Sequence, residues 1–474
     1  MWFLNRFDPA SPAYNVAVAL RMTGALDHEA LVAAVADILD RHESLRTVYP
    51  DSVDGPHQRI LPTGEALDEL ALDELGHGEA VGSDLTDRIR EAVSSGFDVT
   101  AEIPIEVTLL RESADSHVLV VVVHHISIDG WSMDVLAADL VQAYSARVRG
   151  EAPAWKPLPV QYADYALWKR QVLGAEDDPQ STVARQISYW SAELAGAPEV
   201  LELPADRIRP AIPSHVGGKV DTEIGADVYD AVCALARAAN ATPFMVLHAA
   251  LAVLLARLSG SDDVSIGTPV AGRGERELDD VVGMFVNTLV LRTELEPSAS
   301  FADLMDEVRG TDLAAYAHAD VPFEQLVEVI SPARSTAHHP LFQVVLAFEG
   351  PKPHSISLPD VEISSEELDF GIAKFDLQVE VAERVDTNGA GAGARVTFTY
   401  ACDLFDASTA RGFADRFVRL LTAAVSDPAY RSATSKCSAP PSDRRACPRQ
   451  RTRCRCGCCR TCSPTPPPTP ARPP

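Results

Sequence analysis

Apolar and polar residues follow two different periods along the first 430 residues of the chain. After Asp27, a candidate helix N-cap, apolar residues recur every three or four positions, which predicts a helix. Ile103–Leu110 and His117–Val123 predict two strands, and the second, HVLVVVV, is apolar enough to be buried on both faces. Another helix is expected from about Trp131 to the stop signal Gly150. The pattern is typical of an alternating α/β chain.

The same alternation returns after a segment, about 150 to 215, that is rich in proline and aromatic residues. We predict the following elements beyond it: a helix from Thr242 to Leu258, strands at Val264–Gly267 and Val286–Leu291, helices at Phe301–Ala319 and from Pro322, a strand at Leu341–Phe348, a hairpin of Phe375–Val381 and Arg395–Tyr400, and a helix from Ala407. The chain therefore divides into a first lobe (1–155), a connecting segment (156–215) and a second lobe (216–430).

Each predicted lobe closes with a strand, a seven-residue turn and an amphipathic helix. The first turn, residues 124–130, reads HHISIDG, and the second, residues 401–407, reads ACDLFDA. Only the first turn contains histidine. A repeat with one reactive turn and one inert turn indicates a single active site near the junction of the lobes.

Charge excludes several classes of partner. The 474 residues include 41 Lys and Arg against 68 Asp and Glu, so the net charge is −27 and the pI is near 4.8. Such a chain repels phosphate backbones and anionic lipids, and no apolar run reaches the roughly 18 residues of a membrane span. The first residues also lack the pattern of a secretory signal. We expect a cytoplasmic protein that binds neither nucleic acid nor membranes.

Residues 431–474 differ in composition from the rest of the chain. They hold seven of the nine Cys, ten Lys and Arg and one acid, so they carry +9 and leave −36 on the first 430 residues. They contain no Val, Leu, Ile, Met or aromatic residue and cannot bury apolar surface, so we predict a disordered tail. The cysteines lack the paired spacing of a zinc site. We interpret the Arg/Cys/Pro-rich tail as the product of a frameshift near Arg431.

The turn from His124 to Gly130 carries the candidate chemistry. Consecutive side chains at the end of a strand point to opposite faces, so only one of His124 and His125 can face the active site. Asp129 can satisfy the turn or pair with a base, and Gly130 allows angles or close approach that a side chain would prevent. The next helix aims free N–H groups at the same place. We expect no metal, because no third ligand has suitable spacing.

HHISIDG resembles the HHxxxDG motif of condensation domains of non-ribosomal peptide synthetases, which are chloramphenicol-acetyltransferase-like acyltransferases. Six more segments resemble the other motifs of that family, in the same order: Arg41–Thr47, Tyr162–Trp168, Ile266–Arg273, Val282–Thr288, His318–Glu324 and His339–Gln343. The resemblance runs to about residue 430. It implies an α/β fold of two acetyltransferase-like lobes in a V-shaped pseudo-dimer, with a tunnel between them.

The resemblance also implies a reaction that joins a donor aminoacyl or peptidyl thioester to an acceptor aminoacyl thioester. Phosphopantetheine arms of upstream and downstream peptidyl carrier domains would hold both substrates, beside an adenylation domain, and the domain, a monomer, would bind no cofactor of its own. An imidazole has a pKa of about 6.5 and an α-amine about 8, so an imidazole can take the proton that the amine loses. His125 is the candidate, either as a base or as a group that orients the amine.

Further site residues follow from the same resemblance. The residues expected to support the turn are His124, Asp129, Arg46 and Arg41. Among them, Asp129 is expected to form a buried ion pair with Arg46. The backbone N–H of Gly130 is the candidate oxyanion donor. Asn287 and Trp190 are expected to line or brace the tunnel.

Two departures from the family pattern leave alternatives open. The family's first motif is incomplete at Met1, so we expect that the chain starts late, and no Gly-Gly-x-Ser carrier attachment motif is present. We therefore interpret the chain as a fragment of a larger synthetase. The alternatives are a stand-alone acyltransferase that uses acyl-coenzyme A or a single acyl carrier, an epimerisation domain, and a truncated, inactive remnant.

Overall fold

The computed structural model describes residues 1–53, 55–71, 78–79, 83–330, 335, 337–350, 357–366, 371–385 and 391–429. The chain divides into two compact units, Met1–Ala433 and Thr434–Pro474, and every described residue belongs to the first unit. The predicted tail lies outside the described residues.

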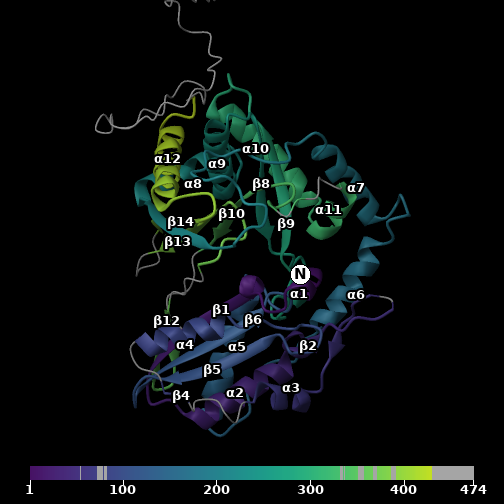
Figure 1. Cartoon of the computed structure of the whole chain (residues 1–474), viewed down its shortest axis with the longest axis vertical. Helices are drawn as coiled ribbons and strands as arrows, with labels where there is room; N and C mark the ends of the chain where they lie inside the picture. The colour runs from purple at the N-terminus through teal and green to yellow at the C-terminus, as the bar shows by residue number, and fades with distance from the viewer. Residues whose placement is uncertain are drawn as a thin grey trace, which may run out of the picture. The chain divides into compact units, whose positions relative to one another are not determined.

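A six-stranded sheet forms the core of the first lobe, with strand order β11-β12-β1-β6-β5-β4 (Figure 1). Its strands are β1 (Asn15–Gly24), β4 (Gly78–Glu79), β5 (Ile105–Arg111), β6 (Ser116–His124), β11 (Ser357–Leu358) and β12 (Val361–Glu366). Only β4 and β5 run parallel, and the other neighbours are antiparallel. A separate short hairpin pairs β2 (Thr47–Val48) with β3 (Arg59–Ile60).

The central strand β6 is buried on both faces, as its apolar run predicts. Its odd-numbered residues in 119–123 pack with α2 (His28–Arg41) and α5 (Gly130–Val148). Its even-numbered residues in 118–122 belong to a second cluster with α4 (Ser83–Val93). Asp27 caps α2 as predicted, because its Oδ1 accepts the N–H of Ala30 at 3.0 Å. Helices on both faces therefore fix the strand that leads into the histidine turn.

The second lobe contains the other six-stranded sheet, with strand order β7-β14-β13-β10-β8-β9. Its strands are β7 (Gly217–Ile224), β8 (Asp263–Val270), β9 (Asn287–Glu294), β10 (Val344–Glu349), β13 (Leu377–Val385) and β14 (Gly391–Ala401). The predicted hairpin is confirmed, since β13 and β14 pair antiparallel.

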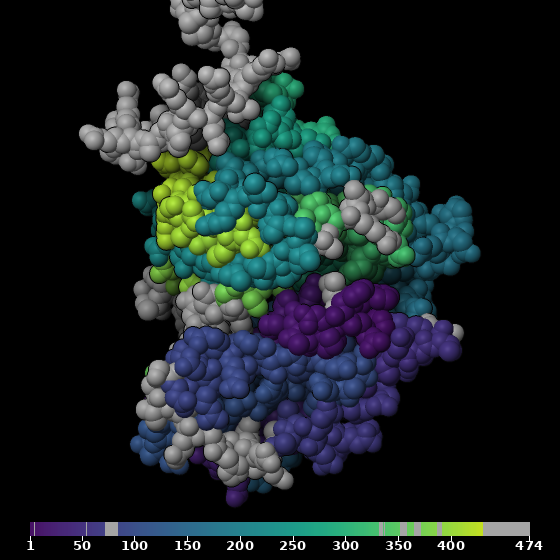
Figure 2. Space-filling view, viewed as in Figure 1, coloured from purple at the N-terminus to yellow at the C-terminus, as the bar shows by residue number. Residues whose placement is uncertain are grey.

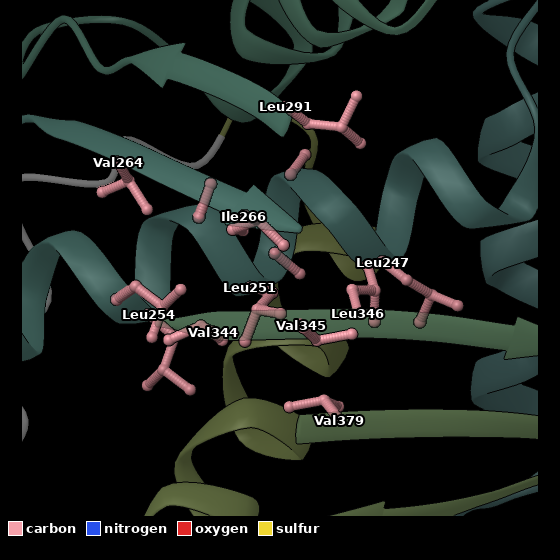
Figure 3. Close-up of a cluster of buried hydrophobic side chains, with 14 of the residues drawn as sticks. Leu247, Leu251, Leu254, Val264, Ile266, Leu291, Val344, Val345, Leu346 and Val379 are labelled. Atoms are coloured by element: carbon pink, nitrogen blue, oxygen red, sulfur yellow. The ribbon is translucent and has the colours of Figure 1, made fainter. Parts of the chain in front are cut away.

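Helix α9 (Pro243–Ser259) is the central helix of this lobe. It is apolar on nearly every side, and Figure 3 shows Leu247, Leu251 and Leu254 packed among valine and isoleucine side chains of the sheet. The other helices of the same apolar cluster are α8 (Ala226–Ala238), α10 (Phe301–Ala317) and α12 (Ala407–Ser426). A helix that is buried all round needs this complete cover.

A four-strand repeat relates the two sheets. The order β1-β6-β5-β4 in the first sheet corresponds to β7-β14-β13-β10 in the second, and in both the fourth strand is parallel to the third. Helix α5 follows β6 as α12 follows β14. The repeat agrees with the predicted α/β fold of two lobes.

The predicted domain division needs one addition and one correction. The connecting segment contains two capped helices, α6 (Tyr162–Leu173) and α7 (Thr182–Glu193). The range 216–430 does not belong wholly to the second lobe, because β12 pairs with β1 and extends the first sheet. Pairing between such distant strands depends on backbone hydrogen bonds, and these leave no period in the sequence.

The remaining helices are α1 (Trp2–Phe7), α3 (Thr63–Leu70) and α11 (Phe323–Ile330). Figure 2 shows the N-terminal residues, in purple, at the surface, and α1 exposes Phe3 and Phe7 there. In the described part of the chain, no helix by itself has the length and apolar composition to cross a membrane; α8 and α9 meet both criteria only as a pair, with a bend of 104° between them.

Candidate active site

His125 lies directly after β6, at the start of the turn to α5. Its backbone N–H donates to the carbonyl of Tyr14 at 2.7 Å, and its side chain is half-buried. Burial and, to a lesser extent, the positive charge of Lys374 lower the pKa of the imidazole. The ring is therefore neutral at pH 7, as a proton acceptor requires, and its Nδ1 is buried without a hydrogen-bond partner among the described residues.

His124, the last residue of β6, is a structural residue. It is 1% exposed, and its Nδ1 accepts the N–H of Ile126 at 3.1 Å. The centroids of the Phe97 and Tyr14 rings each lie 6.2 Å from the centroid of its imidazole. Burial is the main reason why its pKa is lowered to about 4. Of the two histidines, His125 is the less buried.

Asp129 is the N-cap of α5 and is 2% exposed. Its Oδ1 accepts the N–H of Ser132 at 2.8 Å, and its Oδ2 accepts the N–H of Phe285, from the second lobe, at 2.9 Å. The cation beside it is Arg273, whose Nη2 lies 3.5 Å from Oδ1. The predicted ion pair of Asp129 with Arg46 is therefore wrong.

Arg46 and Arg41 bind other groups of the first lobe. Arg46 donates to the carbonyls of Leu39 at 3.0 Å and Leu61 at 2.5 Å. These bonds hold its guanidinium within the first lobe, where it does not pair with Asp129. Arg41 pairs with Asp139 at 2.8 Å. Both arginines support the fold of the lobe that carries the turn.

A segment of the second lobe, Val282–Phe285, is fixed on this turn. The carbonyl and the N–H of Gly283 lie 2.8 Å and 3.1 Å from the hydroxyl oxygen of Ser132. A Cβ on Gly283 would lie 2.2 Å from the ring of Tyr162, so only glycine fits. Ser44 adds a hydrogen bond of 2.8 Å to the carbonyl of Val282. The reactive turn is thus held by residues of both lobes.

Asn287 and Trp190 brace the second lobe. The side-chain amide of Asn287 donates to the carbonyls of Ala319 at 2.9 Å and Val321 at 2.7 Å. Trp190 is 1% exposed and donates its indole N–H to the carbonyl of His318 at 2.9 Å. Of the two predicted roles, bracing fits both residues, since a side chain as buried as Trp190 does not line an open passage.

Gly130 is the first residue of α5 and is exposed. An added Cβ would meet no described atom within 4 Å, so the predicted close approach of the chain to this glycine is absent from the described structure. Its N–H makes no hydrogen bond to a described residue and stands at the positive end of the helix dipole. The space beside it is open for a bound group.

The model of the condensation domain family matches residues 1–444. This chain belongs to that family. It is 46% identical over 428 residues to a dimodular nonribosomal peptide synthase of Bacillus subtilis and 45% identical over 429 residues to an isonitrile lipopeptide synthase of Mycobacterium tuberculosis. Both matches cover 90% of this chain, which spans 18% and 17% of the length of those relatives. The resemblance noted in the sequence is confirmed.

Solved structures agree with this membership. The X-domain from teicoplanin biosynthesis is 34% identical, with a TM-score of 0.82 over 91% of this chain and 94% of that one. The condensation domain of a monacolin K polyketide synthase, at 22% identity, shares the fold with a TM-score of 0.73 over 91% of this chain and 96% of that one. The two-lobe acetyltransferase-like fold of this condensation domain is therefore shown.

Three residues around the turn of this condensation domain, Arg273, Tyr14 and Lys374, were not predicted from the sequence. Arg273 ends the motif Ile266–Arg273, and a buried aspartate needs a cation, so this motif was the available signal. No sequence motif indicated Tyr14 or Lys374. The Nζ of Lys374 lies 4.8 Å from the centroid of the Tyr14 ring, and its side chain is exposed. Desolvation by the surrounding protein nevertheless lowers the pKa of Lys374 to about 8.

Other features of the described residues do not add to this site. No three His, Cys, Asp or Glu side chains in the described ranges are grouped to hold a metal ion. A cavity of about 450 Å³ in the second lobe is lined by Arg209, His338 and Asp376 among others, and Arg209 and Asp376 already pair with each other there. The predicted tunnel between the lobes stays a prediction.

Proposed function

We propose that this condensation domain joins a donor aminoacyl or peptidyl thioester to an acceptor aminoacyl thioester. Amide-bond formation by acyl transfer is the activity of its family. The observation that carries the proposal is the turn itself, which holds a half-buried, neutral His125 and a Gly130 whose N–H bonds to no described residue. A proton acceptor and an oxyanion donor in one turn suit attack on a thioester.

Each group has a defined part in the proposed reaction. The acceptor nitrogen attacks the donor carbonyl carbon, a C–N bond forms and the C–S bond breaks. His125 takes the proton that the nitrogen loses and returns it to the departing thiolate, or it orients the amine by a hydrogen bond. The N–H of Gly130 donates to the oxyanion of the tetrahedral intermediate. Asp129 and Arg273 hold the turn in place.

The proposed partners follow from the relatives. Those relatives are synthetases of which this chain matches only a part, so we propose that upstream and downstream peptidyl carrier domains and an adenylation domain act beside it. The carriers supply the phosphopantetheine arms, and the domain binds no cofactor of its own. We expect it to act as a monomeric part of a cytoplasmic synthetase.

The test uses loaded donor and acceptor carriers with the wild-type chain and with His125→Ala. Mass spectrometry of the acceptor carrier should show the dipeptidyl product with the wild-type chain, and a trace of it at most with the variant. Equal product with both proteins would refute the role of His125. Urea unfolding of both proteins shows whether the substitution changes stability.

The same assay separates the alternatives. Exchange of the Cα hydrogen without a dipeptide would identify an epimerisation domain. Transfer from acyl-coenzyme A without a donor carrier would identify a stand-alone acyltransferase. No reaction with any donor would identify an inactive remnant.

A further inference from the structure

Lys374 lies on a bend directly before β13, and the residues on both sides of it are anchored. The N–H of Ala373 donates to the carbonyl of His215 at 2.9 Å. The ring centroids of Phe375 and His339 lie 5.0 Å apart, and Asp376 pairs with Arg209 through both carboxylate oxygens. The backbone at Lys374 is therefore fixed by the second lobe.

From this bend the side chain reaches the first lobe. Its ammonium lies over the ring of Tyr14, 4.8 Å from the centroid, and the carbonyl of Tyr14 accepts the N–H of His125. No described carboxylate forms an ion pair with Lys374, whose side chain is exposed. A positive charge without a described carboxylate partner thus lies over Tyr14, the residue that binds the backbone of His125, and acts on the imidazole that the proposed reaction uses.

The charged and titratable groups around this ammonium come from both lobes. The first lobe contributes Tyr14, His124, His125 and the amino group of Met1, and the second contributes Glu324, whose charge acts on Tyr14. Burial lowers the pKa of His125 most, and Lys374 lowers it further. A fixed cation disfavours a second positive charge nearby, whether on an imidazole or on an amine.

We propose that Lys374 is a positioning residue for the reaction at His125: its ammonium gives the site a positive potential that keeps the imidazole and the incoming acceptor amine in their neutral, reactive forms. The inference rests on the proposed function, because it requires a free amine as nucleophile. The amine must be neutral to attack, and the imidazole must be neutral to take the proton. Lys374 itself neither gives nor receives that proton.

The test compares Lys374→Met, Lys374→Arg and a control, Lys219→Met, which removes an exposed lysine of β7. NMR of ¹³C-labelled histidine, with the His125 signal assigned from His125→Ala, measures the pKa of His125 directly. Loss of the charge in Lys374→Met should raise this pKa by about half to one unit. Lys374→Arg and Lys219→Met should leave it unchanged, because the charge at position 374 is kept.

The rate of condensation from pH 5.5 to 9.5 gives the second readout. The acidic limb of Lys374→Met should move to higher pH, so that its rate is about 3–10-fold lower than wild type on that limb. The two rates should converge above pH 9, where the wild-type lysine, with its pKa of about 8, has also lost its charge. Lys374→Arg keeps the charge, so the acidic limb of its pH–rate profile should match that of the wild-type chain.

The outcomes separate this inference from the proposed function. An unchanged His125 titration in Lys374→Met, or an equal loss of rate at every pH, would overturn the inference and give Lys374 a structural role. A shifted titration in a chain that forms no dipeptide would support the coupling of Lys374 to His125 while it refutes the proposed function.

Discussion

The two turns that follow the central strands have the same backbone and different chemistry. Two residues at the start of each turn donate their N–H groups to residues just before the neighbouring strands. The bonds are His124 to Pro104 (2.8 Å) and His125 to Tyr14 (2.7 Å) in the first lobe, and Ala401 to Asp376 (3.1 Å) and Cys402 to Val216 (2.9 Å) in the second. The repeat therefore extends to individual hydrogen bonds.

The two turns differ in the polarity of the side chains that they bury. The first turn buries His124, Ser127 and Asp129, whereas the second buries Leu404 and Phe405. Buried polar groups require partners, and Asp129 finds some of its partners in the other lobe. Apolar packing satisfies the second turn within its own lobe. The buried polar groups of the first turn therefore make it dependent on both lobes, whereas the second turn depends on one.

Substitution of the two N-cap aspartates should give the largest difference between the turns. Asp129→Ala leaves the buried Arg273 without its carboxylate and should lower the free energy of unfolding by about 3–5 kcal/mol. Asp406→Ala breaks only an exposed pair with Arg207 and should cost less than about 1 kcal/mol. Urea unfolding at pH 7 measures both changes. Equal losses of unfolding free energy in the two variants would contradict the greater dependence of the first turn on its aspartate.

Substitution of the equivalent residues His125 and Cys402 should separate activity from stability. His125→Ala should reduce the rate of condensation by about 10²–10⁴-fold, because the proton acceptor is lost. Cys402→Ala, at the matching position of the inert turn, should keep the wild-type rate. Steady-state rates with loaded carriers measure the effect. A similar loss of activity in both variants would show that position 125 has only a structural role.

Acid should destabilise the first turn through His124, whereas Ala401 at the matching position cannot titrate. The folded-state pKa of His124, about 4, lies below its unfolded value of about 6.5, so stability is full above pH 6.5 and falls as the pH drops toward 4. This residue should account for about 3 kcal/mol of the loss. Other histidines titrate too, so the measurement is the difference between wild type and His124→Asn at pH 7 and pH 4. A constant difference would refute a buried, neutral His124.

The first helical residues, Gly130 and Ala407, should give the smallest change in stability. Gly130→Ala should stabilise α5 by about 0.5 kcal/mol and Ala407→Gly should destabilise α12 by a similar amount, since alanine favours a helix more than glycine does. The rate of condensation should fall only in Gly130→Ala, because the added methyl group occupies the open space at the start of α5, where the proposed oxyanion binds. An unchanged rate in that variant would show that the substrate does not use this space.

Much of the fold followed from local pattern. The apolar run of β6, the cap at Asp27 and the hairpin of β13 and β14 are set by neighbouring residues, and the sequence contains those residues in order. Helices α6 and α7 were missed because proline and aromatic residues obscured their period. The pairing of β12 with β1 was missed because it joins distant segments.

The site was predictable where a motif contained the chemistry. The histidine pair and Asp129 lie within seven residues, so their shared location followed from the sequence. The identity of the cation beside Asp129 did not, because Arg46 and Arg273 both lie within motifs of the family, and only the fold brings Arg273 to the turn. Lys374 has no motif of its own, and its proximity to Tyr14 depends on contact between the lobes.

The pairing of β12 along β1 has a practical consequence for engineering. A chimera assembled by exchanging residues 1–155 alone would pair the host strand β12 with a foreign β1, across six paired positions from Ala19 to Gly24. Grafts that carry residues 357–366 together with residues 1–155 should preserve the pairing of β12 with β1. The sensible unit of exchange between synthetases is therefore discontinuous in sequence.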